Sequence, residues 1–144
     1  MIVRTELRSD TQPVDLAGMT TDEHVGGWWE YWRRFRGDRA ERKALELGEP
    51  QTVVRAHDLV AELVDNGGRE GLEIIVALID AAPDDGELVT VGAGPLEDFL
   101  NVCADPLVDQ VERLARRSPR FRTALRSTIL PDRLHARFAP LLGR

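Results

Sequence analysis

The stretch that decides the fold lies in the second half of the chain and reads Gly92-Ala93-Gly94-Pro95-Leu96-Glu97-Asp98. Pro95 suits the first position of a helix, with Gly94 as the residue that caps it. Glu97 would then lie in the first turn, where a carboxylate can accept backbone N–H groups and face the positive end of the helix dipole. Because Gly92 can end the preceding segment in a left-handed conformation, the stretch predicts a tight corner between two helices.

The same stretch has a second interpretation as an anion site, because glycine-flanked helix starts bind phosphate. Glu97 and Asp98 would repel a phosphate, however, and the run lacks the Lys and the Ser or Thr of a phosphate loop. We therefore interpret Gly92, Gly94, Pro95 and Glu97 as a structural motif.

Similar helix starts occur on both sides of this motif. Asp105-Pro106 and Ser118-Pro119 each combine a capping residue with a proline, and Thr20 with Glu23 matches a capping box. Apolar residues recur at helical spacing between these starts. Residues 87–91 are β-branched in part, but we expect a short helix there because no partner strand is evident. The sequence predicts an all-α fold of six to seven helices, in a compact bundle or a short stack of helical hairpins.

Length and composition predict one soluble domain. The chain has 144 residues, of which 42% are hydrophobic and 31% charged. We expect residues 1–19 to form an extended or disordered arm and residues 20–144 a single helical domain. No run approaches the roughly 18 apolar residues of a membrane span, and the start lacks the apolar run of a signal peptide. With Cys103 as the single cysteine, the expected location is the cytoplasm.

Charge is distributed unevenly along the chain, whose net charge is −6. Residues 112–144 hold nine arginines against Glu112 and Asp132, a balance of +7, so the preceding 111 residues carry −13. Such polarity could orient a partner or support self-association. A solvated set of helix faces is the simpler explanation.

One predicted helix is rich in aromatic residues. Trp28, Tyr31, Trp32 and Phe35 fall on one face at helical spacing, with Trp29 at its edge. Large aromatics in a domain of this size usually lie in the core. The alternative is a partner-binding face, for which Trp28, Trp29 and Trp32 are the candidate anchors.

The arginine-rich end suggests nucleic-acid binding as an alternative function. Arg116, Arg117 and Arg120 surround the predicted turn at Ser118-Pro119, which could imitate helix-turn-helix geometry. Against this, the chain as a whole is acidic, and the basic footprint is confined to one end.

Catalysis is the weakest of the three classes of function. The acidic pairs Asp84-Asp85, Glu97-Asp98 and Glu62/Asp65 could do acid–base work only if the fold brought them together. An enzyme or small-ligand site would have to combine Glu97, Asp98 and His57. The sequence contains no metal-binding spacing, no cofactor motif and no evident set of nucleophile and base, and Cys103 falls on the core face of its helix.

Three segments resemble a bacterial family, the domain of unknown function 6869: residues 81–85 (Ala-Ala-Pro-Asp-Asp), residues 91–100 around the opening motif, and residues 117–125. The similarity covers about residues 53–128. Phe99 stands where leucine is more usual, and Ser118 replaces the common aspartate. The resemblance implies a small, mainly helical bacterial protein, and it transfers no catalytic or binding residue.

We therefore expect an interaction protein that works by binding a macromolecular partner, as an immunity protein, an antitoxin or a regulatory adaptor does. A protein is the expected partner, self-association stays open, nucleic acid is the alternative, and no membrane is involved. The acidic portion could meet a basic partner, and exposed members of the aromatic stripe could anchor it.

Overall fold

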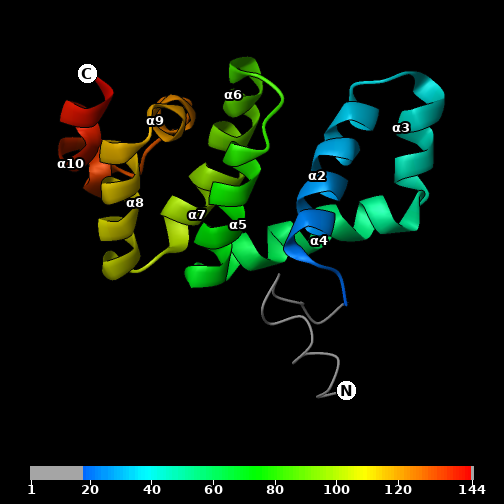
Figure 1. Ribbon diagram of the computed structural model, residues 1–144, viewed down its shortest axis with the longest axis horizontal. Coiled ribbons are helices and arrows are strands. Elements are labelled where there is room, and N and C mark those ends of the chain that lie inside the picture. Colours follow the sequence, from blue (N-terminus) through cyan, green and yellow to red (C-terminus); the bar gives the residue numbers. More distant parts are fainter. Residues whose placement is uncertain (1–17, 144) are drawn as a thin grey trace. The chain divides into compact units, whose positions relative to one another are not determined.

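The computed structural model describes residues 18–143, and within this range the chain is helical and has no strand (Figure 1). This confirms the all-α prediction. The described helices number eight when Leu88–Val102 is counted as one, so the predicted six to seven was slightly low. Most of the expected arm over residues 1–19 lies outside the described residues.

The chain divides into two compact units, Met1–Val60 and Ala61–Arg144, with the boundary inside helix α4. The expectation of a single helical domain over residues 20–144 stays a prediction.

Unit 1 is built from α2 (Thr21–Phe35), α3 (Arg39–Glu46) and the first part of α4 (Gln51–Asp65). The predicted capping box at Thr20 and Glu23 is present, and Asp38 with Glu41 forms a second one at the start of α3. The core of this unit consists of buried apolar side chains from all three helices: Val25, Trp28, Leu45, Val53, Ala56 and Val60.

Unit 2 continues from the end of α4 through α5 (Arg69–Asp80), a 3₁₀ turn (Asp85–Glu87), α6 (Leu88–Val91), a π-helical turn (Gly92–Leu96) and α7 (Glu97–Val102). It is completed by α8 (Asp105–Arg117), α9 (Pro119–Arg126) and α10 (Asp132–Leu142). The short helix expected at residues 87–91 is confirmed. Large side chains from α5 to α10 are fully buried in this unit, among them Ile75, Phe99, Phe121 and Phe138.

The predicted corner at residues 92–98 is wrong. Gly92 has φ −65° and ψ −47°, which is right-handed helix, and the backbone runs from α6 through the π-helical turn into α7 without a break. The N–H of Glu97 donates to the carbonyl oxygen of Gly92, five residues back. A proline inside a helix has no N–H to donate, and its ring collides with the preceding turn. The widened turn accommodates Pro95 without ending the helix.

Gly92 is needed for a close approach between helices. A Cβ built on Gly92 would lie 1.9 Å from the carbonyl oxygen of Ala124, which shows that the backbone of α9 packs directly on the π-helical turn. Glu97 also has a different role from the predicted one. Its carboxylate accepts a hydrogen bond from the N–H of Ile129, beyond α9, at 2.7 Å.

The two other predicted helix starts differ in outcome. Ser118 caps α9 as expected, because its hydroxyl accepts from the N–H of Phe121 at 3.0 Å. The start of α8 is shifted by one residue. Ala104 is the capping residue there, and Asp105 is already the first residue of the helix.

Candidate functional site

The aromatic residues of α2 form a cluster in unit 1 together with His57 of α4. The ring of Tyr31 stacks on that of His57 with centroids 3.8 Å apart and planes 15° apart, and Trp32 meets the same imidazole at 5.8 Å. His57 is thus held in an aromatic stack, and its imidazole lies 3.4 Å from the carboxylate of Asp58.

Burial divides the three predicted tryptophan anchors. Trp28 is 2% exposed and belongs to the core, which removes it from the surface of the chain. Trp29 and Trp32 are half-buried, whereas Phe35 at the end of the stripe is 47% exposed. The indole nitrogen of Trp32 is buried and, among the described residues, has no hydrogen-bond partner.

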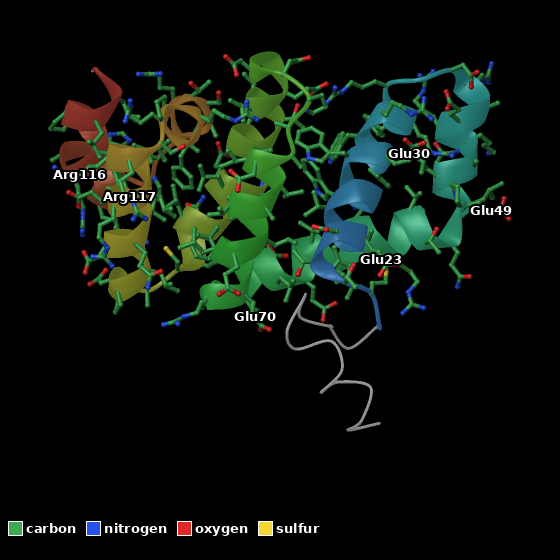
Figure 2. The ribbon with its side chains drawn as sticks, viewed as in Figure 1. Glu23, Glu30, Glu49, Glu70, Arg116 and Arg117 are labelled. Atoms are coloured by element: carbon green, nitrogen blue, oxygen red, sulfur yellow. The ribbon has the colours of Figure 1, made fainter. Side chains whose placement is uncertain are left out.

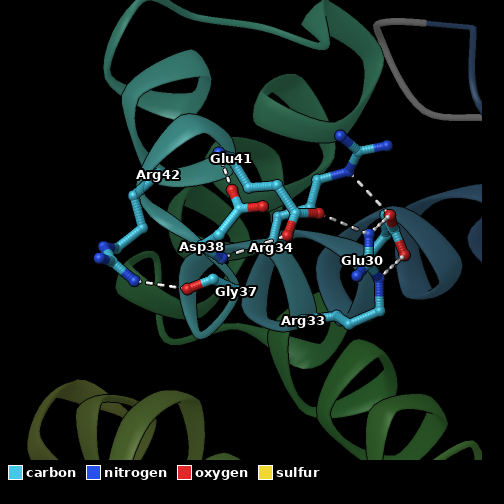
Figure 3. A network of polar contacts seen from close by, with 7 residues as sticks. All are labelled: Glu30, Arg33, Arg34, Gly37, Asp38, Glu41 and Arg42. Atoms are coloured by element: carbon cyan, nitrogen blue, oxygen red, sulfur yellow. Dashed lines mark hydrogen bonds and ion pairs between the residues drawn. The ribbon is translucent and has the colours of Figure 1, made fainter.

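Arg33 and Arg34, which lie between Trp32 and Phe35 in the sequence, are neutralised within unit 1. The carboxylate of Glu30 lies 2.7 Å from both Arg33 and Arg34, and Arg33 also reaches Glu41 at 3.1 Å (Figure 3). Hydrogen bonds from the Arg33 and Arg34 guanidinium groups lower the pKa of Glu30 to about 2. Arg33 and Arg34 are therefore paired with carboxylates of the same unit.

Most arginines at the C-terminal end are engaged inside unit 2. Arg120 donates to the carbonyl oxygens of Ile79 at 2.7 Å and Ala82 at 3.2 Å, at the end of α5. Four others bind a carboxylate or a backbone carbonyl of this unit: Arg116, Arg122, Arg133 and Arg137. Of the three arginines predicted to contact a partner, only Arg117, beside Arg116 at the end of α8, has no such contact in the described part of the chain (Figure 2).

The end of α4, the start of α5 and α7 pack together in unit 2, and each carries exposed carboxylates. A Cβ on Gly71 of α5 would lie 2.6 Å from the carbonyl oxygen of Leu63 in α4 and 3.3 Å from the ring of Phe99 in α7. The end of α4, the start of α5 and α7 therefore meet at this glycine. Their exposed acidic side chains form what we call the acidic corner: Glu62, Asp65, Glu70 and Asp98.

The acidic corner carries negative charge that no side chain of the described residues neutralises. The pKa of Asp98 is raised, first by partial burial and then by the carboxylates of Asp65 and Glu97. None of the four side chains forms a hydrogen bond or ion pair within residues 18–143. In contrast, Glu112 is bound by Arg116 and Arg137, and hydrogen bonds from them lower its pKa. Over the described range, no three His, Cys, Asp or Glu side chains converge as metal ligands would.

The structure joins two acidic pairs that the sequence shows separately. Glu62/Asp65 and Glu97-Asp98 are visible as pairs, but only the fold brings Asp65 close enough to act on the pKa of Asp98. Glu70 was missed, because a single acid in the first turn of a helix is ordinary.

The other residues proposed for chemistry have structural surroundings. His57 lies in unit 1, while Glu97 and Asp98 lie in unit 2, and Glu97 already binds a backbone N–H. Cys103 is 5% exposed, and burial raises the pKa of its thiol, which opposes formation of a nucleophilic thiolate.

In a comparison with known protein families, residues 43–134 match DUF6869, a family of unknown function. The chain belongs to this family. The match is wider than the segments quoted above, and the DUF6869 region includes the π-helical turn and the acidic corner but not α2 with its tryptophans. No curated protein and no solved structure matches the chain. Among the helices of residues 18–143, none combines the length and apolar character needed to cross a membrane.

Proposed function

We propose that this protein works by binding a basic protein partner through the acidic corner. A small regulatory protein, such as an immunity protein, an antitoxin or an adaptor, fits this role. The observation that supports the proposal is at Asp98, whose pKa is raised by partial burial and by the carboxylates of Asp65 and Glu97, and to which the described residues supply no cationic partner.

The charge balance of the surrounding sequence adds to this argument. Residues 61–111 contain twelve carboxylates and one arginine. Several of these acids have a partner in the chain, such as Asp85 with Arg120 and Asp109 with Arg137. Like charges that stay unpaired destabilise a fold, so a patch of this kind suggests a cationic partner that arrives from outside.

The test uses a variant in which the acidic corner is neutral: Glu62→Gln, Asp65→Asn, Glu70→Gln and Asp98→Asn. Immobilised wild-type protein should retain a basic protein from the native host, and the neutral variant should lose at least about tenfold in affinity for it. A matched control removes four exposed carboxylates elsewhere: Glu46→Gln, Glu49→Gln, Asp58→Asn and Asp132→Asn. The proposal fails if the control and the corner variant lose the partner equally, or if no basic protein is retained.

Nucleic-acid binding stays an alternative with a narrow basis. Arg113 and Arg117 are exposed arginines of α8 that have no partner within the described residues, whereas their neighbours on the same helix and on α9 are engaged. Two cations give few phosphate contacts, so binding would be weak and steeply dependent on salt. A salt titration with duplex DNA and with RNA distinguishes this alternative.

A further inference from the structure

A groove on unit 2 runs between α5 and α8. It has a volume of about 310 Å³ and is lined by Arg69, Leu72, Glu73 and Val76 of α5 and by Gln110 and Leu114 of α8. Val76 and Leu114 are half-buried, so the floor of this α5–α8 groove leaves apolar surface in contact with water. Arg120, which follows α8 closely in the chain, binds the last carbonyls of α5, so the two helices end on the same side of the unit.

The two walls of the groove carry opposite charges. Asp80 follows Val76 by four residues and Glu73 by seven, so both carboxylates share the groove face of α5. On α8, Arg113 and Arg117 follow Gln110 and Leu114 by three residues and share the groove face in the same way. On the α5 wall, Glu73 and Asp80 outweigh Arg69, so this wall has a net negative charge, whereas the α8 wall is basic.

The four charged residues Glu73, Asp80, Arg113 and Arg117 have no partner among residues 18–143. All four are exposed, and across the part that the structure describes none forms a hydrogen bond or ion pair. Asp80 is also the last residue of α5, where a negative charge opposes the helix dipole. The helix itself therefore gains nothing from this carboxylate.

A partner of one sign would satisfy one wall of the groove and repel the other. A second copy of the same chain carries both walls. When a two-fold axis runs along the groove, α5 of each copy faces α8 of the other, because such an interface places the same surface patch on both sides. Glu73 and Asp80 of each copy then meet Arg113 and Arg117 of the other.

We propose that this protein forms a two-fold dimer in which the α5–α8 grooves of two copies face each other. The apolar floor supplies the contact around Val76 and Leu114, and the charged walls set the register and the choice of partner. Because the charged walls lie at the rim, the dimer weakens as the salt concentration rises. The dimer does not depend on the acidic corner, because none of the four carboxylates of the acidic corner lines the α5–α8 groove.

Sedimentation equilibrium of the full chain tests the proposal with two double variants. Glu73→Arg with Asp80→Arg makes both walls basic, and Arg113→Glu with Arg117→Glu makes both acidic. Each variant alone should dimerise at least about tenfold more weakly than wild type. An equimolar mixture should recover the dimer as a heterodimer, because every acidic wall then faces a basic one.

Arg39→Glu with Glu49→Arg, two exposed residues of unit 1, is the matched control and should dimerise like wild type. Circular dichroism checks that each variant is folded. If a charge reversal unfolds the chain, the neutral pair Asp80→Asn and Arg117→Gln replaces it and should weaken the dimer. A wild-type protein that is monomeric at all concentrations overturns the proposal, and so does any stoichiometry other than two, or a mixture that associates no better than its components.

Discussion

The carboxylate of Glu97 accepts a hydrogen bond from the backbone N–H of Ile129 at 2.7 Å, across 32 residues of sequence. The bond ties the start of α7 to the segment between α9 and α10. Hydrogen bonds to a charged group contribute more than neutral ones, but this bond is accessible to water. We expect Glu97→Ala to lower the free energy of unfolding by about 1 kcal/mol, measured by urea denaturation.

Glu97→Gln is the control for this bond, because the amide oxygen of glutamine can still accept from Ile129. It should lose less stability than Glu97→Ala. An alanine variant as stable as wild type would show that the bond contributes nothing to folding.

The π-helical turn gives a second prediction, in which two glycines behave in opposite ways. A Cβ at Gly92 would lie 1.9 Å from the carbonyl oxygen of Ala124, whereas a Cβ at Gly94 has no neighbouring atom within 4 Å. Gly92→Ala should lower the free energy of unfolding by about 2–3 kcal/mol, because the backbone of α9 must move. Gly94→Ala should raise it by up to about 1 kcal/mol through helix propensity. Thermal and urea unfolding measure both variants. If Gly92→Ala and Gly94→Ala changed the free energy of unfolding equally, the packing described for Gly92 would be contradicted.

These two glycines also show what the sequence could predict and what it could not. Caps and helical periods are local, so the all-α fold and the starts at Thr20 and Ser118 could be predicted from the residues themselves. A glycine followed by a proline, as at Gly94-Pro95, fits both the start of a helix and a widened turn within one, so this pair of residues does not distinguish the two structures. The contact of Gly92 with Ala124 of α9 distinguishes the two, and no local pattern predicts it.

The candidate site has the same limit. Its carboxylates are visible in the sequence as separate pairs, but their proximity depends on how α4, α5 and α7 meet around Gly71. Tertiary contacts also decided the role of the C-terminal arginines. Their number suggested a basic surface, yet Arg120 and Arg122 bind backbone carbonyls of neighbouring helices.

The raised pKa of Asp98 predicts an unusual dependence of stability on pH. A carboxyl group whose pKa is higher in the folded state binds protons more readily there. Its ionised form therefore lowers the free energy of unfolding, and this loss is relieved as the pH falls through the raised pKa. Asp98→Asn should therefore be more stable than wild type at pH 7. The difference should shrink as the pH approaches the ordinary carboxyl range from above. Urea denaturation of both proteins between pH 7 and pH 4 measures it, and a difference that grows toward low pH would exclude repulsion at Asp98.

Arg120 is expected to stabilise the end of α5. Its guanidinium donates to the carbonyl oxygen of Ile79 in the last turn of α5 and to that of Ala82 just beyond the helix. Arg120→Ala should lower the free energy of unfolding by about 1–2 kcal/mol. Arg55→Ala is the matched control, because Arg55 is exposed on α4 and has no partner among the described residues, so its effect should stay within about 0.5 kcal/mol. A loss of stability as large in the Arg55 variant would point to a general effect of charge.

Glu30 should affect acid stability in the opposite direction to Asp98. Hydrogen bonds from Arg33 and Arg34 lower its pKa from 4.5 to about 2, so the folded state holds the ionised carboxylate more firmly than the unfolded chain does. The stabilisation is fully present above pH 4.5 and is lost as the pH falls toward 2. Because these ion pairs are largely exposed, we expect Glu30→Gln to cost less than about 1 kcal/mol at pH 7. Urea denaturation should show the difference from wild type shrinking as the pH falls from 4.5 through about 2. A difference that is constant with pH would mean that the ion pairs with Arg33 and Arg34 do not contribute.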